Sequence, residues 1–278
     1  MDPSELKKKL ERIVGERNPF NSPRRLAEVE SYIESELKSY GLQVESDPFT
    51  YLGKSYRNII GRGRANPNAS LVILGAHFDS VEGTPGADDN ASGVAVLLEA
   101  ARLLAAARLK YQLLLCAFNL EEQNMIGSAH LAKRLKSAGA RIRAMISLEM
   151  VGFTDRRPGS QNYPLGLSWF YPERGDFIGI VGNWRSYSLL RQFTRPMQRV
   201  RGLPVETLTV LGNGFLLPAV RLSDHSPFWD LGYPALLVTD TSFFRNPHYH
   251  RPSDTLETLD LDFMAKVCEG VVAGVLGL

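Results

Sequence analysis

The sequence is poor in the features that mark several large classes of protein. It has only 2 cysteines in 278 residues, which excludes a secreted scaffold held together by disulfides. No apolar stretch has the length of a membrane span, and no internal repeat or low-complexity segment interrupts the chain. We expect Cys116 and Cys268, which fall in an apolar strand and in the last helix, to be buried free thiols.

Charge and the first residues give further exclusions. The formal net charge is only +2, and basic residues neither run together nor alternate with aromatic ones, which argues against a nucleic-acid partner. The first residues are helix signals and contain no apolar signal-peptide core. We therefore expect a cytoplasmic protein without membrane attachment, although a secreted or periplasmic chain that had lost its leader would begin in the same way.

Short apolar runs alternate with stretches of helical spacing along most of the chain. Such continuous runs are typical of strands covered on both faces. We therefore predict an α/β fold, a three-layer α/β/α sandwich with a central mixed, mostly parallel sheet, in a single domain over residues 1–278. The expected strands are Leu71–Ala76, Gln112–Phe118, Ala144–Leu148, Phe177–Val181 and Ala235–Thr239, and the expected helices begin near Asp2 and Ser22 or cover 91–107, Ile126–Leu135 and Asp260–Leu278.

One long segment, residues 153–176, has no clear period. It is rich in proline, glycine and aromatic residues. A loop of this length in a compact domain is often functional, so the segment is either a lid or pocket wall, or a meandering surface loop. The sequence leaves both interpretations open.

The residues able to carry out chemistry follow the predicted strands directly. His77 and Asp79 come after the first strand, and side chains two apart in an extended segment point the same way, so Asp79 can accept the second ring N–H of His77. Asp88 and Asp89 follow at a predicted helix start, where acidic residues also serve as caps. Because two acids and an amide bracketed by glycines exceed what capping needs, we expect a carboxylate there that can bridge two metal ions.

A second acidic pair, Glu121 and Glu122, follows the next buried strand, and Glu149 ends the third. One glutamate of the pair can bind a metal while its neighbour stays free as a base beside a metal-bound water, whose pKa the metal lowers towards roughly 7. Taken alone, a solvated helix start explains the pair equally well, and Glu149 alone would pass for a salt-bridge partner. Because the carboxyl ends of parallel strands meet at one edge, these groups together predict a metal site, with two metals favoured.

Histidines also occur in two segments nearer the end of the chain. His225 could pass for a triad histidine, but the sequence has no Gly-x-Ser-x-Gly turn to supply a nucleophile. Either His248 or His250 can face the site, and Tyr249 between them adds a phenol able to stabilise an oxyanion. His130 falls on a predicted helix among basic residues and is expected on the surface.

Six motifs, in fixed order, carry a resemblance to a known family. They are HFDS (77–80), GADDNASG (86–93), NLEEQNMIGSAHLA (119–132), SLEMVGF (147–153), SDHSPFW (223–229) and HYHRPSDT (248–255). From about residue 22 to 260 the chain resembles the zinc-dependent aminopeptidases with a co-catalytic metal pair. Their superfamily includes the bacterial leucyl aminopeptidases, the glutamate carboxypeptidases and the glutaminyl cyclases.

The resemblance implies two zinc ions and a ligand set for each. His77, Asp89 and Glu149 would bind one zinc. Asp89, Glu122 and His250 would bind the other, so that Asp89 bridges the pair. Many members have aspartate where this chain has Glu149, whose longer side chain should still reach a metal.

Three further roles follow from the same resemblance. Glu121 would be the general base for a hydroxide that bridges the metals, and Asp79 would be the partner of the first histidine ligand. Tyr249 sits where some members place a tyrosine that binds the substrate carbonyl. The family also implies a cis peptide bond between Asp89 and Asn90.

The expected activity is therefore that of a di-zinc metallo-aminopeptidase, which hydrolyses peptides with a free N-terminus. No basic cluster stands out to bind an acidic C-terminal residue, so we expect removal of neutral or apolar N-terminal residues. The apolar candidates for a side-chain pocket are Met150, Phe153, Phe215, Phe243, Phe244 and Tyr249.

Two other functions stay open at this point. A glutaminyl cyclase, a single-zinc enzyme that closes N-terminal glutamine to pyroglutamate, uses the same scaffold, the same glutamate pair and a similar Ser-Asp-His-x-Pro-Phe stretch. The glutaminyl cyclases of this superfamily lack the acidic pair that corresponds to Asp88 and Asp89, which is intact in this sequence. A non-enzymatic relative that keeps the fold without metals usually loses ligands, and none is missing from this sequence.

Overall fold

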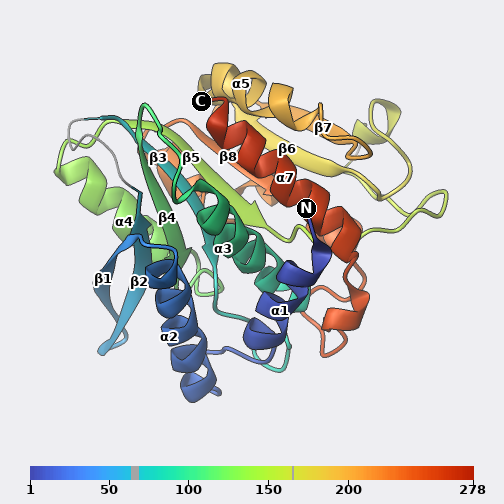
Figure 1. Cartoon of the computed structure of the whole chain (residues 1–278). Coiled ribbons are helices and arrows are strands. Elements are labelled where there is room, and N and C mark those ends of the chain that lie inside the picture. The colour runs from blue at the N-terminus through green and yellow to red at the C-terminus, as the bar shows by residue number, and fades with distance from the viewer. Residues whose placement is uncertain (64–68, 165) are drawn as a thin grey trace.

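The protein is built around one mixed β-sheet of 8 strands, with helices on both faces (Figure 1). The structure, a computed structural model, describes residues 1–63, 69–164 and 166–278. The strand order confirms the predicted fold class. Along the sheet the strands are β1 (Gln43–Tyr51), β2 (Lys54–Arg62), β4 (Gln112–Phe118), β3 (Leu71–His77), β5 (Ile142–Glu149), β8 (Ala235–Thr239), β6 (Ile178–Asn183) and β7 (Val205–Val210).

The directions of the strands decide where the site lies. The four central strands, β4, β3, β5 and β8, run parallel, so their carboxyl ends meet at one edge of the sheet. Strand β6 is antiparallel to β8 and parallel to β7, so β6 and β7 begin at that same edge. Strands β3 and β5 run one residue further than predicted and end on His77 and Glu149 themselves.

Two apolar cores, one on each face of the sheet, hold the layers together. In β3 the side chains of Val72 and Leu74 enter one core while those of Leu71 and Ile73 enter the other, as the alternation of a strand requires. The first core is shared with α1 (Pro3–Ile13), α2 (Pro23–Ser39), α3 (Gly93–Leu104), α5 (Tyr187–Met197) and α7 (Leu261–Leu276), which lie on one side of the sheet in Figure 1. The second core is shared with α4 (Ile126–Ser137) and α6 (Ser226–Asp230).

Several predicted features agree with the structure, and several elements were not predicted. Strands β4 and β8 coincide with their predicted bounds, Asp2 caps α1 by accepting the N–H of Ser4, and both cysteines are buried free thiols. The hairpin β1–β2, helix α5 and strand β7 lie in stretches to which the sequence assigned no element. Among the described residues, no helix is both long and apolar enough to cross a membrane.

Candidate metal centre

Two histidines and three carboxylates gather at the carboxyl edge of the central strands. They form two groups of three residues, in each of which the candidate ligand atoms lie within 4.8 Å of one another. The first group is His77, Asp89 and Glu149, and the second is Asp89, Glu122 and His250. These are the two ligand sets that the family resemblance implied.

Asp89 belongs to both groups because its two oxygens face opposite ways. Its Oδ1 lies 3.3 Å from Nε2 of His77, and its Oδ2 lies 3.0 Å from Nε2 of His250. The remaining carboxylates complete each group, with Glu149 Oε1 at 3.2 Å from the first histidine and Glu122 Oε2 at 3.4 Å from the second. A carboxylate so placed has the geometry of a bridge between two cations.

Burial and hydrogen bonds to the histidines set the pKa values of this cluster. Burial would raise the pKa of Asp89, but its hydrogen bonds with His250 and His77 outweigh burial and hold that pKa low. Burial, helped by the charge of Asp89, raises the pKa of Glu122 to about 7. Burial would lower the pKa of His250, whereas its hydrogen bonds to Asp89 and Glu122 raise it to about 10.

The donor atoms fit a pair of zinc ions. Oε1 of Glu122 is buried without a hydrogen-bond partner among the described residues, so this carboxylate still has a free acceptor. Imidazole nitrogens and carboxylate oxygens are ligands that zinc takes in catalytic sites. A cation at each group would also offset the repulsion among these buried carboxylates.

Glu121 lies beside the cluster but belongs to neither ligand group. Its Oε2 is 3.9 Å from Nε2 of His77. Burial raises its pKa well above the usual range, and the negative charge of Glu149 adds to this effect. A carboxyl group that binds protons strongly and faces a cavity is suited to accept a proton and hand it on.

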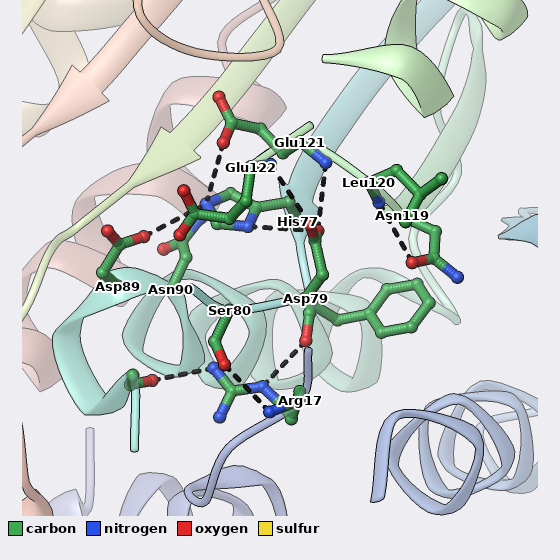
Figure 2. Close-up of polar contacts among 12 residues, drawn as sticks. Arg17, His77, Asp79, Ser80, Asp89, Asn90, Asn119, Leu120, Glu121 and Glu122 are labelled. Carbon is green, nitrogen blue, oxygen red and sulfur yellow. Dashed lines mark hydrogen bonds and ion pairs between the residues drawn. The ribbon is translucent and has the colours of Figure 1, made fainter. Parts of the chain in front are cut away.

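Asp79 holds the glutamate pair in place through the backbone. Its two oxygens accept the N–H groups of Glu121 and Glu122, each at 3.1 Å. Figure 2 shows Asp79 between this backbone and the ring of His77. Oδ1 of Asp79 is 3.5 Å from Nδ1 of His77, longer than an ordinary hydrogen bond, so its closer partners are the two amides.

Asp254 holds the aspartate pair in place through the backbone, as Asp79 holds the glutamate pair. Its oxygens accept the N–H groups of Asp88 at 2.9 Å and Asp89 at 3.1 Å. Burial, helped by the charge of Asp88, raises the pKa of Asp254 to about 7. The sequence analysis quoted this residue within its last motif but gave it no role.

Asn90 ties the loop of Asp89 to the end of β5. Its Nδ2 donates to the carbonyl of Leu148 at 2.8 Å, and its Oδ1 accepts the N–H of Met150 at 3.1 Å. Leu148 and Met150 flank Glu149, so one amide fixes two metal-binding segments relative to each other. The peptide bond between Asp89 and Asn90 is cis, as the resemblance implied.

Arg17 supports the loop after β3 that leads to Asp89, and it lies below this loop in the view of Figure 2. The side chain is fully buried and donates to the carbonyls of Phe78 at 2.8 Å, Pro85 at 2.8 Å and Gly86 at 2.8 Å. Gly86 has a φ of 59°, and a Cβ there would lie 2.7 Å from Nη2 of Arg17, so only glycine suits this position.

His225 has a structural role. It is fully buried, its Nε2 lies 2.9 Å from the carbonyl of Val220, and burial lowers its pKa to about 3. The neighbouring Ser223 contacts the metal centre instead, since its hydroxyl donates to Oε2 of Glu149 at 2.8 Å. The sequence analysis quoted Ser223 in a motif without assigning this contact.

The other histidines also separate clearly. His250 faces the centre, whereas His248 is turned away, with Nδ1 at 2.9 Å from the hydroxyl of Ser253. His130 lies at the surface of α4, as expected, but it contacts a buried carboxylate. It is half-buried, and its Nε2 lies 3.4 Å from Oδ1 of the buried Asp47, because the unpredicted β1–β2 hairpin covers part of α4.

A cavity of about 370 Å³ opens beside the metal centre. Tyr249 lines it, and its ring stacks on that of His250 with centroids 3.7 Å apart. Of the other apolar candidates Phe243 and Phe244 line the cavity, while Met150 and Phe153 lie in the core and Phe215 is exposed. The segment 153–176 lines the cavity as well, with Gln161, Asn162, Tyr163, Pro164, Leu167 and Tyr171, which favours the pocket-wall interpretation.

A centre of two histidines and three carboxylates, at the carboxyl edge of a mixed α/β sheet, is typical of zinc-dependent exopeptidases. The model of the family described as Peptidase family M28 matches residues 58–275. The chain belongs to this peptidase family, which confirms the predicted enzyme class and makes peptides its class of substrate.

Individual proteins agree with this assignment. The chain is 38% identical to the uncharacterized protein YfbL of Escherichia coli over 87% of its own length and 77% of that protein. It is 31% identical to a probable leucine aminopeptidase of Arthroderma otae over 72% of this chain, and it spans only about half (52%) of that relative.

Solved structures share the fold. The LapA aminopeptidase of Legionella pneumophila superposes with a TM-score of 0.78 at 18% identity, over 99% of this chain and 71% of that one. The glutaminyl cyclase of Porphyromonas gingivalis superposes with a TM-score of 0.70 at 21% identity, over 98% of this chain and 95% of that one. At these identities the likeness shows the fold alone.

Proposed function

We propose that the chain is a di-zinc aminopeptidase that removes neutral or apolar N-terminal residues from peptides. The observation that carries the proposal is the placement of Asp89, whose two oxygens each face a different histidine, at 3.3 Å and 3.0 Å. The apolar walls of the adjacent cavity support the preference for such residues. The leucine aminopeptidase name of the Arthroderma otae relative supports the activity.

The residues around the centre divide the work of hydrolysis. When bound, a zinc pair would polarise the scissile carbonyl and lower the pKa of the attacking water. Glu121 takes a proton from that water as its oxygen attacks the carbonyl carbon, and delivers it to the leaving nitrogen as the C–N bond breaks. Tyr249, which lines the same cavity, donates to the oxyanion, and the carboxylates at this end hold the ammonium group of the substrate.

The first test counts metal and removes the base. We expect two zinc ions per chain by elemental mass spectrometry on zinc-replete protein. Glu121→Gln should keep both ions, because Glu121 lies outside both ligand groups, yet lose at least about 100-fold in kcat on aminoacyl amides. Glu82→Gln, an exposed glutamate on the loop after β3, is the control and should keep wild-type kcat. A Glu121→Gln variant with wild-type kcat would contradict the mechanism.

A glutaminyl cyclase is the second candidate, because the fold also matches that of the Porphyromonas gingivalis cyclase. Such an enzyme would convert a peptide that begins with glutamine into the pyroglutamyl peptide and release ammonia. One zinc per chain, together with cyclisation and no released amino acid, would replace the first proposal. The cytoplasmic location and the absence of nucleic-acid and membrane partners stay predictions from the sequence.

A further inference from the structure

The cavity reaches from the metal centre across the sheet to the edge strand β7. Its near end is formed by the carboxylates of the centre, and its walls are mostly apolar, with Leu208 and Leu237 among them. One carboxylate stands apart from the centre, that of Glu206 on β7. None of the described residues that line the cavity is a lysine, an arginine or a histidine.

Strand register places Glu206 in line with the metal ligand Glu149. Glu149 pairs with Thr239 on β8, Thr239 pairs with Gly179 on β6, and Gly179 pairs with Glu206 on β7. Three strand spacings of about 4.8 Å separate the two glutamates, a span of about 14 Å. Paired residues of neighbouring strands share a face of the sheet, so both carboxylates project on the cavity side, and Gly179 adds no side chain between them.

Glu206 also has no hydrogen-bonding or ionic partner in the part of the chain that the structure describes. It is half-buried, and burial raises the pKa of its carboxyl group. The two nearby tyrosines do not satisfy it. The hydroxyl of Tyr163 donates to the carbonyl of Pro172, and that of Tyr171 donates to the carbonyl of Thr207.

The end of the cavity at β7 carries groups that bind a cation. The rings of Tyr163 and Tyr171 stack with centroids 5.9 Å apart, and both line the cavity together with the carboxylate of Glu206. Aromatic faces and a carboxylate bind ammonium and guanidinium groups, and a charge-assisted bond is worth more where water is partly excluded. The apolar walls between the two ends suit the methylene stem that carries such a group.

We propose that Glu206 selects substrates whose N-terminal side chain is long and ends in a cation, namely lysine or arginine, in addition to the apolar residues that the walls accept. The proposal rests on the proposed aminopeptidase function, since it takes the cavity as the site for the N-terminal side chain. The stem lies along the apolar walls, and the terminal ammonium or guanidinium group donates to the carboxylate of Glu206.

The kinetic test compares lysyl and norleucyl amides of aminomethylcoumarin, whose side chains differ only in the terminal ammonium group. We expect the wild-type protein to have the higher kcat/KM on the lysyl amide. Glu206→Gln should lower kcat/KM for the lysyl amide by about tenfold and leave the norleucyl amide unchanged or improved. Glu173→Gln, an exposed glutamate of the segment 153–176, is the control and should leave both unchanged. A lysyl-to-norleucyl ratio that Glu206→Gln does not alter overturns the proposal.

A binding test separates this proposal from the proposed activity. Isothermal titration calorimetry with n-pentylammonium and with n-pentanol measures binding affinity and needs no turnover. We expect Glu206→Gln to weaken the binding of n-pentylammonium about tenfold and to leave the binding of n-pentanol unchanged. If no aminoacyl amide is cleaved, the aminopeptidase proposal fails, while this titration still decides whether Glu206 is a cation site. If norleucyl amide is cleaved and both ligands bind the two proteins equally, only the Glu206 proposal fails.

Discussion

At the scale of single residues, each of the two acidic pairs is held through its backbone amides by a carboxylate from another segment. Asp79 accepts the amides of Glu121 and Glu122, and Asp254 accepts those of Asp88 and Asp89. The side chains of Asp89, Glu121 and Glu122 are therefore left available for metal, water and substrate, whereas the oxygens of Asp88 accept the N–H of Gly152 and the Nδ2 of Asn246. Ordering of this kind usually governs metal affinity and activity by about 10–100-fold.

Asp79→Asn tests this clamp on the glutamates. Asparagine keeps one acceptor oxygen, but its NH₂ group would face the second amide, donor against donor, so the pair Glu121-Glu122 should shift. We expect kcat/KM on leucyl amide to fall by about 10–100-fold, with a weaker metal affinity measured by competition with a chelator.

Two further variants define how this result is interpreted. Asp254→Asn should behave like Asp79→Asn, because it disturbs the other acidic pair in the same way. Asp2→Asn, at the exposed cap of α1, is the control, because asparagine also caps helices, and it should change nothing. If Asp79→Asn keeps both wild-type activity and wild-type metal affinity, the clamp has no role.

At the scale of elements, the sequence predicted best the strands that are buried on both faces. Strands β4 and β8 could be assigned to the residue because their apolar runs are continuous. Strand β1 contains Pro48 and alternates exposed with buried positions, and β7 is an edge strand with half-buried residues throughout most of its length. Edge strands pair on one side only, so their sequences carry a weaker apolar signal.

The same limit applies to the site. The residues of the two candidate ligand groups could be predicted because each follows a buried strand or lies in a motif, and chemistry restricts metal ligands of this kind to histidine and carboxylate. The support from Arg17 could not be predicted, because Arg17 lies 60 residues before His77 in sequence. Nothing in the residues around Arg17 indicates that it donates to the carbonyls of residues 78, 85 and 86. Glu206 was missed because the register of three successive strand pairings, which only the fold defines, brings it into the cavity.

The junction between α3 and β5 is the element contact on which the site depends most directly. A Cβ at Gly93 would lie 2.3 Å from Oδ1 of Asn90 and 2.9 Å from the carbonyl of Leu148. Asn90 cannot turn away without losing its bonds to the end of β5. Gly93→Ala should therefore push α3 off the sheet, with a loss of about 1–3 kcal/mol in the free energy of unfolding.

Chemical denaturation and leucyl-amide kinetics measure the two consequences of Gly93→Ala, which are lower stability and lower kcat. Gly63→Ala is the matched control, because the nearest atoms to a Cβ there lie 3.8 Å away, at ordinary contact distance. Equal stability and equal kcat for the two variants would show that the α3–β5 junction tolerates a side chain, against the expectation.

At the scale of the whole molecule, the fold concentrates carboxylates at one edge of its sheet and buries most of their surface. Asp89, Glu121, Glu122 and Glu149 are brought together from three different segments, and burial raises the pKa of the three glutamates. Such a cluster opposes folding unless cations bind to it. Metal that binds the folded chain alone therefore adds to stability through mass action.

This reasoning predicts opposite effects of one substitution in the two metal states. At pH 8, above the pKa of about 7 that Glu122 has in the metal-free fold, the side chain is ionised and repelled by Asp89. Glu122→Gln removes that charge, so it should raise the Tm of chelator-treated protein by a few degrees. With excess zinc the order reverses, because the variant lacks one ligand of the second group and gains less from metal. Glu11→Gln, an exposed glutamate of α1, should shift neither Tm. If the chelator leaves the wild-type Tm unchanged, or if Glu122→Gln lowers Tm equally with and without zinc, the carboxylate edge is not held together by metal.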